Sequence, residues 1–250
     1  SRRPLSVGLD GATVYNTPPP TQGLASLMIL GLYERLRVAP EQAEGFAHIH
    51  GLIEATKLAF RVRNTHIADP GAMQIHATTF LSDHLLDRLA AEVSPKRALP
   101  WPLPAMSGDT VWLGCIDAEG RAVSFIQSLY HAYGSGVVLP ETGLLWHNRA
   151  IAFDFDPESP RFLAPGRKPF HTLSPALARF RDGRVMVYGS MGGDGQPQTQ
   201  AAVFTRHALY GQGLQAAAAS ADEGELGGDE HAVHSDQGED RQHGEQHRGD

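Results

Sequence analysis

The sequence predicts an α+β protein in which helices come first, a mostly antiparallel sheet follows and a further helix closes the pattern. Apolar residues recur at helical spacing through residues 23–36 and 41–63. From Thr110 onward the pattern changes to the two-residue alternation that is typical of strands. A proline-rich segment over residues 94–109 separates the two halves and is typical of a surface linker.

The first half begins with a strand signal that ends at three consecutive prolines. The predicted elements are a strand over residues 11–16 and helices over residues 23–36, 41–63 and 82–92. Thr21 and Ser82 precede two of these helices, and both are residue types that cap helix N-termini. Asp69 and Pro70 follow the longest helix, after which the chain is expected to turn away.

The second half contains most of the strand signals. The predicted elements are strands over residues 111–116, 122–129, 142–147, 177–180 and 185–188, followed by a helix over residues 200–210. Residues 117–120 suit a hairpin turn between the first two strands. Asp182-Gly183 is a strong hairpin signal between the last two.

Composition excludes several classes of protein. The chain has 250 residues, 41% hydrophobic and 20% charged, which is ordinary globular composition. The single cysteine, Cys115, excludes an internal disulfide framework and argues against a zinc–thiolate site. No apolar run has the length of a membrane span, so no membrane partner is expected. No secretion signal is visible, and the compartment stays open, with the cytoplasm favoured over the periplasm.

The acidity of the chain is concentrated in its last residues. The net charge is −7, and residues 220–250 hold ten acidic and two basic residues, so the remainder is close to neutral. No basic cluster stands out, and no nucleic-acid partner is expected. Residues 219–250 are poor in apolar side chains and are expected to be a disordered acidic tail. The histidines of this tail suit solvated chain better than a metal site; they are His231, His234, His243 and His247.

Thr110 is the residue around which a chemical hypothesis can be built. A threonine hydroxyl is a poor nucleophile without an adjacent base. Cleavage between Asp109 and Thr110 would free an α-amine on the same residue, with an ordinary pKa of about 7.7–8.0. A lone threonine after Gly-Asp more often simply begins a strand, so the surrounding motifs must decide.

Seven motifs, in order, connect both halves of the chain to one family. They are residues 14–23 (VYNTPPPTQG), 54–60 (EATKLAF), 69–70 (DP), 108–110 (GDT), 134–137 (GSGV), 164–169 (APGRKP) and 189–193 (GSMGG). Each motif is weak alone, whereas their order and spacing over residues 1–217 are highly specific. In these motifs the chain resembles the gamma-glutamyltranspeptidase family of N-terminal-nucleophile hydrolases.

The resemblance implies a fold and a set of catalytic residues. The fold would be part of a four-layer αββα arrangement, and no metal or organic cofactor is expected. Thr110 would be both the autoprocessing residue and the nucleophile, with Ser128 orienting its hydroxyl. Gly192 and Gly193 match the pair whose backbone N–H groups stabilise the tetrahedral oxyanion. The implied partners are a small-molecule amide or gamma-glutamyl substrate and, after cleavage, the large and small subunits for each other.

The chain departs from true gamma-glutamyl transferases where those enzymes hold the substrate. Their Asp-Asp-Phe segment aligns with residues 151–153, so Ala152 offers no carboxylate to a substrate α-amine. A pocket asparagine aligns with Tyr130, and a Ser-Ser pair aligns with His171 and Thr172. All three are therefore candidate substrate-binding residues. These replacements are similar to the branch of oxamate amidohydrolase-like and cephalosporin acylase-like proteins.

Arg149 completes the candidate substrate site. A guanidinium there could clamp a carboxylate on an acyl group bidentately, and a surface arginine is the equal alternative. The expected function is amide hydrolysis through an acyl-enzyme on Thr110, on a small amide that carries a carboxylate. Two alternatives stay open: a true gamma-glutamyltransferase or glutathione hydrolase, and a truncated, inactive fragment.

The resemblance also divides the chain into three parts. Residues 1–109 match the C-terminal part of the family's large subunit and are expected to be mostly helical. Residues 110–218 match much of the small subunit, with most of the strands and the catalytic residues. Residues 219–250, the acidic tail, resemble no part of the family.

Overall fold

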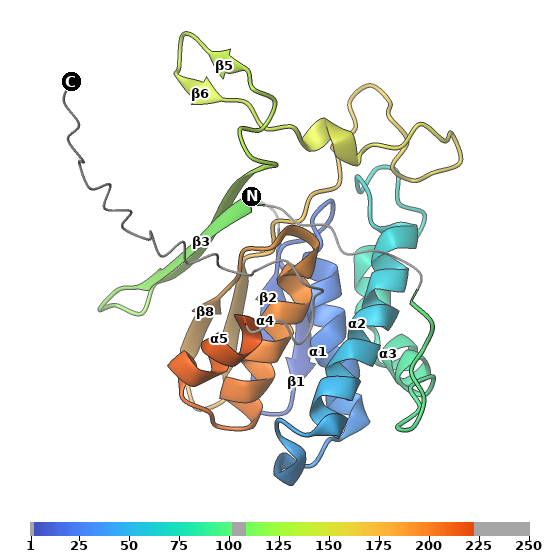
Figure 1. Cartoon of the computed structure of the whole chain (residues 1–250), viewed down its shortest axis with the longest axis vertical. Helices are drawn as coiled ribbons and strands as arrows, with labels where there is room; N and C mark the ends of the chain where they lie inside the picture. Colours follow the sequence, from blue (N-terminus) through green and yellow to red (C-terminus); the bar gives the residue numbers. More distant parts are fainter. Residues whose placement is uncertain (1–2, 102–108, 223–250) are drawn as a thin grey trace, which may run out of the picture.

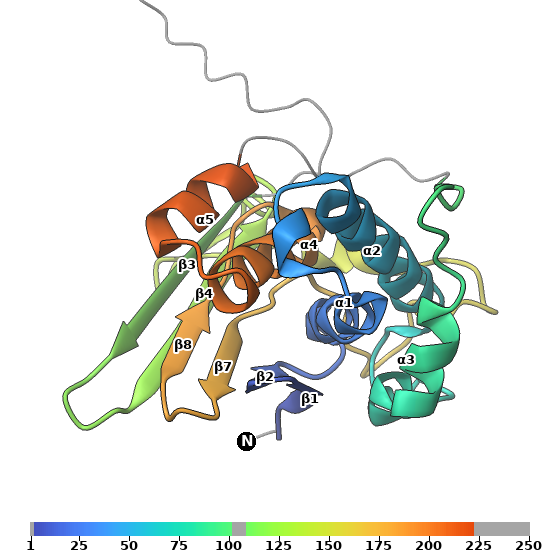
Figure 2. The same ribbon diagram turned by 90° about the horizontal axis from the view of Figure 1, so that it is seen from below.

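A four-stranded antiparallel sheet with helices over one face forms the body of the molecule (Figures 1 and 2). The computed structural model describes residues 3–101 and 109–222. The strand order is β1-β2-β7-β8, so strands from the two ends of the chain share one sheet. The strands are β1 (Leu5–Leu9), β2 (Ala12–Asn16), β7 (Ala176–Phe180) and β8 (Val185–Tyr188).

Helix α1 (Gly23–Leu36) lies at the centre of the core. Every residue from Gly23 to Tyr33 is buried, because the helix contacts β1 and β2 on one side and other helices around it. Those helices are α2 (Phe46–His66), α3 (Asp83–Ala90) and α4 (Gln196–Phe204). Gly31 allows close packing, since a Cβ there would lie 2.9 Å from Leu86 Cδ1 and 3.1 Å from Val7 Cγ2.

One face of the sheet is buried and the other is more exposed, because successive side chains of a strand point to opposite faces. Leu5, Val7 and Leu9 of β1 are buried, whereas the residues between them are exposed. The helices cover the buried face, which Figure 2 shows edge-on. The core is one continuous cluster of buried apolar side chains, which the sheet and the helices around α1 both contribute.

A separate hairpin lies beside β8. Strands β3 (Asp109–Ile116) and β4 (Ala122–Tyr130) form a two-stranded antiparallel sheet. One face of it contacts the main sheet: Trp112 packs on Gly189, and a Cβ on Gly114 would lie 2.7 Å from Val187 Cγ2. The opposite face carries exposed apolar side chains; they are Val111, Leu113, Val123 and Phe125.

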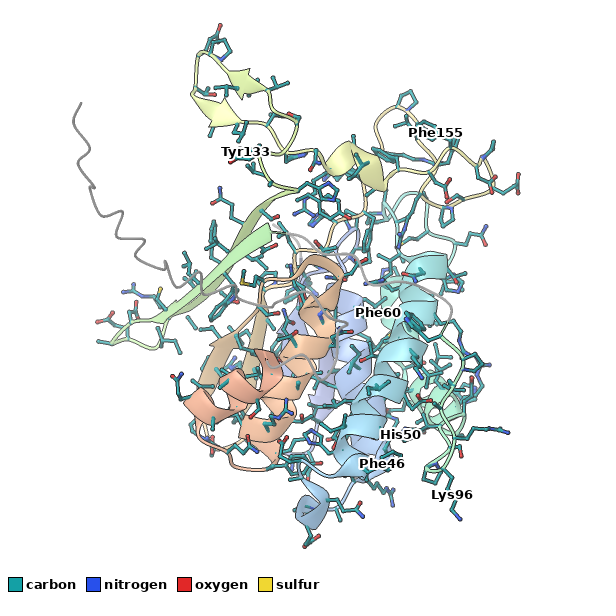
Figure 3. The ribbon with its side chains drawn as sticks, viewed as in Figure 1. Phe46, His50, Phe60, Lys96, Tyr133 and Phe155 are labelled. Atoms are coloured by element: carbon teal, nitrogen blue, oxygen red, sulfur yellow. The ribbon has the colours of Figure 1, made fainter. Side chains whose placement is uncertain are left out.

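An arm, residues 131–160, extends from the end of β4 (Figure 1). It holds the short strands β5 (Val138–Leu139) and β6 (Leu144–Leu145) and the 3-10 turn η3 (Arg149–Ala152). Tyr133 and Phe155 are each 80% exposed on it (Figure 3). Within the arm, the Asn148 N–H donates to the Leu129 carbonyl of β4 at 3.2 Å, which holds this part of the arm against the hairpin.

The predicted helices and hairpins are present, with shifted boundaries. The helix predicted from residue 41 begins at Phe46, because Glu44 takes a left-handed φ of 60° and Gly45 occupies the N-cap position. The helix predicted over 200–210 begins earlier, at Gln196, and ends in a π turn, η5 (Thr205–Leu209). Short 3-10 turns precede α2 and α3: η1 (Pro40–Gln42) and η2 (Ala77–Leu81).

Other predictions need correction. Strand β1 was not expected, and pairing with β2 together with burial against α1 creates it. The strand predicted over 142–147 is reduced to β6, because Gly143 turns with a φ of 69° and the arm supplies only β5 as a partner. The tail prediction began too early, since residues 219–222 belong to α5 (Leu214–Asp222), whose Ala217 is buried. Residues 102–108 and 223–250, including the tail histidines, lie outside the described residues.

The two predicted helix caps differ from expectation in their geometry. Gln22, not Thr21, is the N-cap residue of α1, although Thr21 Oγ1 still accepts a hydrogen bond from the Gly23 N–H at 3.1 Å. Ser82 stands at the N-cap of α3, but its hydroxyl donates to the Thr79 carbonyl at 2.8 Å. Within residues 3–101 and 109–222, none of the helices is long and apolar enough to cross a membrane.

Substituting Gly189→Ala should loosen the β3–β4 hairpin from the main sheet. The new methyl group would overlap the Trp112 indole, which a hydrogen bond from Nε1 to Ser124 Oγ at 3.0 Å also holds. We expect the free energy of unfolding in urea to fall by about 1–3 kcal/mol. The matched control is Gly8→Ala in β1, where nothing lies within 4 Å of the new atom. Equal stability of the two variants would contradict the packing of Trp112 on Gly189.

Candidate active site

Thr110 lies at an irregularity in the hairpin. The pairing register passes from Asp109 opposite Tyr130 to Val111 opposite Gln127. Thr110 therefore faces two residues of β4, of which Ser128 is one, and β4 contains a bulge. The Thr110 side chain is buried, with 8% of the residue exposed.

Tyr130 closes this bulge in a backbone conformation that few residues adopt. Its φ is 83°, in the left-handed region that disfavours side chains other than glycine. Its N–H donates to Ser128 Oγ at 2.8 Å, which ties the hydroxyl to the turn. Strained backbone of this kind persists only where surrounding contacts hold it, and it is often found at functional sites.

Gly192 and Gly193 lie in the turn that joins β8 to α4. Their φ angles are 100° and 50°, which glycine adopts without a steric penalty. The Gly192 carbonyl accepts from the Gly195 N–H at 2.8 Å, closing the 3-10 turn η4 (Gly193–Gly195). Consecutive N–H groups in turns can form a concave site for an anion. The turn can therefore offer the donors that an oxyanion needs.

Strand β3, which carries Thr110, and this glycine turn meet through packing. Trp112 of β3 rests on Gly189, three residues before Gly192. Within the described residues, no hydrogen bond joins Thr110 to Gly192 or Gly193. Their mutual position thus depends on how the hairpin packs against β8.

Arg149 is buried, and no carboxylate in the described part of the chain pairs with it. Only 5% of the residue is exposed, and its Nη1 donates to Thr172 Oγ1 at 3.3 Å. Its Cζ lies 5.0 Å from the centroid of the Tyr130 ring. Its Nη2 is buried and has no hydrogen-bond partner among the described residues. Because the side chain is buried, the surface-arginine alternative is wrong for this structure. Burial also lowers the pKa of the guanidinium.

His171 lies in the same group of residues and stays neutral. Burial lowers the pKa of its imidazole to about 4, and the charges of Arg149 and His147 add to the effect. Its Nδ1 is buried with no partner in the described part of the chain. A neutral ring beside a buried guanidinium leaves the site with unsatisfied hydrogen-bonding capacity.

Three residues outside the predicted set hold this site together. Gln22 donates from Nε2 to the carbonyls of Thr172 and Gly193 at 2.8 and 2.7 Å. Its Oε1 accepts from Arg63 Nη1 at 2.9 Å, and Arg63 in turn pairs with Asp194 at 3.3 Å. Gln22 lies within motif 14–23 and Asp194 directly follows motif 189–193, so their nearness to these motifs is the sequence signal that could have found them. Nothing in the sequence pointed to Arg63 on α2.

The structure brings some of the predicted site residues into direct contact and links others only through a third residue. Thr110, Ser128 and Tyr130 share the bulge, and Tyr130, Arg149 and Thr172 are in contact. Gly193 is connected to Thr172 through Gln22. Within residues 3–101 and 109–222, no group of three or more His, Cys, Asp and Glu side chains is placed to hold a metal ion.

Comparison with known proteins establishes the family. The Gamma-glutamyltranspeptidase family model matches residues 1–224. An oxamate amidohydrolase proenzyme of Klebsiella pneumoniae is 53% identical over 212 residues, which are 85% of this chain and 40% of that protein. The glutathione hydrolase-like YwrD proenzyme of Bacillus subtilis is 37% identical over 214 residues, 86% of this chain and 41% of that protein. The chain belongs to the gamma-glutamyltranspeptidase family.

A solved relative confirms the fold. The structure of a cephalosporin acylase from Bacillus halodurans matches with a TM-score of 0.74 and 31% identity, over 84% of this chain and 38% of that one. The predicted α+β class, as part of the N-terminal-nucleophile hydrolase fold, is therefore confirmed. The chain spans about two fifths of the length of these relatives.

Acidification should destabilise the chain through His171. The unfolded imidazole has an ordinary pKa near 6.5 and the folded one a pKa of about 4. Between these values the unfolded state binds more protons, so the free energy of unfolding falls as pH drops through 6.5, and this loss is complete below pH 4. Urea unfolding across this range should show a shallower pH dependence for His171→Gln. Identical slopes in the variant and the parent would rule out a buried neutral imidazole.

Proposed function

We propose that the protein containing this chain is an amide hydrolase that cleaves itself between Asp109 and Thr110 and acts on a small amide carrying a carboxylate. The observation that carries the substrate class is Arg149, a buried guanidinium with one unpartnered nitrogen beside Tyr130 and Thr172. An isolated buried charge is costly, and an anionic substrate would pair it. Support also comes from the relative at 53% identity, which is named for oxamate, a carboxylate-bearing amide.

The reaction follows from the N-terminal threonine that cleavage would create. The freed α-amine takes the proton from Thr110 Oγ as the oxygen attacks the amide carbonyl. The N–H groups of Gly192 and Gly193 stabilise the resulting oxyanion. Collapse breaks the C–N bond, and the leaving nitrogen takes the proton from the α-amine. Water then adds to the ester, with the α-amine again as base, and the carboxylic acid leaves Thr110.

Two subunits result from the proposed cleavage. Residues 1–109 would end the large subunit and residues 110–218 would supply much of the small one. Both contribute to one sheet, because β2 pairs with β7 across this division. The subunits would therefore stay associated through backbone hydrogen bonds and a shared core.

A glutathione hydrolase is the second candidate, since the relative at 37% identity is named glutathione hydrolase-like. The residues around Arg149 weigh against it. Ala152 lies in the same 3-10 turn and packs against the core, so this position offers no carboxylate to a substrate α-ammonium. The turnover of oxamate and of a gamma-glutamyl anilide by the complete protein would discriminate. Clear preference for the anilide would favour the second candidate.

Substituting Thr110→Ala in the complete protein should abolish both cleavage and turnover. The variant lacks the oxygen that initiates each reaction, so we expect one intact polypeptide by mass spectrometry and a loss of about three orders of magnitude or more in kcat. Thr110→Ser keeps an oxygen nucleophile and should still be cleaved. An uncleaved parent protein would instead overturn the proposed self-cleavage.

Substituting Arg149→Met should impair turnover of a carboxylate-bearing amide. The loss of a charge-assisted contact worth about 1.5–3 kcal/mol predicts a decrease of roughly ten- to a hundredfold in kcat/KM for oxamate. A neutral amide such as acetamide should lose less. Arg179→Met, at an exposed arginine of β7, is the control and should behave like the parent. Equal losses for both amides would argue against carboxylate binding by Arg149.

A further inference from the structure

We propose that Gln22 is a positioning residue that fixes the oxyanion turn relative to the substrate-binding segment; this rests on the proposed function. Gln22 is fully buried at the N-cap of α1. Its backbone N–H donates to the His171 carbonyl at 3.2 Å. Its side chain reaches the next carbonyl, Thr172, and also the carbonyl of Gly193. One residue thus contacts both parts of the candidate site.

The carboxamide of Gln22 is bonded on both sides, which determines its orientation. Both hydrogens of Nε2 are used, one for each carbonyl, and Oε1 accepts from Arg63 Nη1. A flipped amide would direct its oxygen at two carbonyl oxygens and its NH2 group at a guanidinium. Arg63 is itself held by Asp194 and lies over the Phe60 ring, with its Cζ 3.7 Å from the centroid. The position of Gln22 is therefore determined by α2 as well as by α1.

Gly193 needs such a restraint because of its own freedom. Glycine loses more conformational freedom on folding than any other residue, and an oxyanion site works only if its donors are already oriented. The bond from Gln22 holds the Gly193 carbonyl, and with it the planar peptide between Gly193 and Asp194. With this peptide held, the Gly193 N–H can change direction only through the φ and ψ angles of Gly193 itself, which narrows the range it can sample.

The Gln22 side chain also sets the distance between the two parts of the site that would hold the substrate, the carboxylate site and the oxyanion turn. The Thr172 hydroxyl accepts from Arg149, the proposed carboxylate partner, while the Thr172 carbonyl accepts from Gln22. The distance between the carboxylate site and the oxyanion turn is consequently linked through Gln22. Substitution there should displace the reacting carbonyl from its donors, which lowers kcat more than it raises KM.

The test compares two buried glutamines in the complete protein. In Gln22→Met, a residue of similar length cannot donate to either carbonyl, and we expect kcat for oxamate to fall at least about tenfold, with a smaller change in KM. The control is Gln200→Met. Gln200 is also buried, and it donates to the Ser174 carbonyl and accepts from Ser26 Oγ at 3.0 Å. We expect this variant to lose similar thermal stability and to keep kcat within about twofold of the parent.

A second measurement separates this proposal from the proposed function. Hydrogen exchange of the backbone amides of residues 193–195 can be measured in the present chain, whether or not it turns over a substrate. We expect faster exchange there in Gln22→Met and unchanged exchange in Gln200→Met. An inactive parent protein with this exchange pattern would overturn only the amidase assignment. Equal exchange in both variants, or equal loss of kcat in both, would overturn the role of Gln22.

Discussion

Helix α1 is buried on all sides because the sheet, α2, α3 and α4 each pack against it. The position of this one helix determines where its N-terminus lies, and the N-terminus carries Gln22. From there hydrogen bonds reach the segment of His171 and Thr172 and the turn at Gly193. The apolar packing of the core and the geometry of the candidate site are therefore not independent. A change that moves α1 would move the turn at Gly193.

Charge in the candidate site is arranged around arginines rather than carboxylates. Arg63 has Asp194, whereas Arg149 has a threonine hydroxyl and an aromatic ring. The neutral His171 adds no second charge to this group at neutral pH. An arrangement with one buried cation lacking an anion favours a ligand that brings its own negative charge. This is the physical basis for preferring a carboxylate-bearing amide over a substrate held by its α-ammonium.

Much of the architecture could be predicted, since it depends on local pattern. The alternation after Thr110 and the Asp182-Gly183 turn predicted two hairpins that the structure contains. The boundaries of α2 were harder, because a left-handed Glu44 breaks an otherwise helical pattern. The candidate site residues were predicted through the family resemblance, and three of them, Thr110, Ser128 and Tyr130, lie at one bulge. Arg63 could not be predicted, because its role depends on a contact with Gln22 at the N-terminus of another helix, α1.

The sequence by itself determined the family, the order of the elements and the residue types available for chemistry, because motifs and hydrophobic periodicity are local properties. Only the tertiary structure decided that Arg149 is buried and that no carboxylate of residues 3–101 and 109–222 pairs with it. It also decided that β2 pairs with β7 across the proposed cleavage point, and that Gln22 joins Thr172 to Gly193. These features depend on which distant segments become neighbours. That choice is made by the packing of the whole core around α1, which no short stretch of sequence contains.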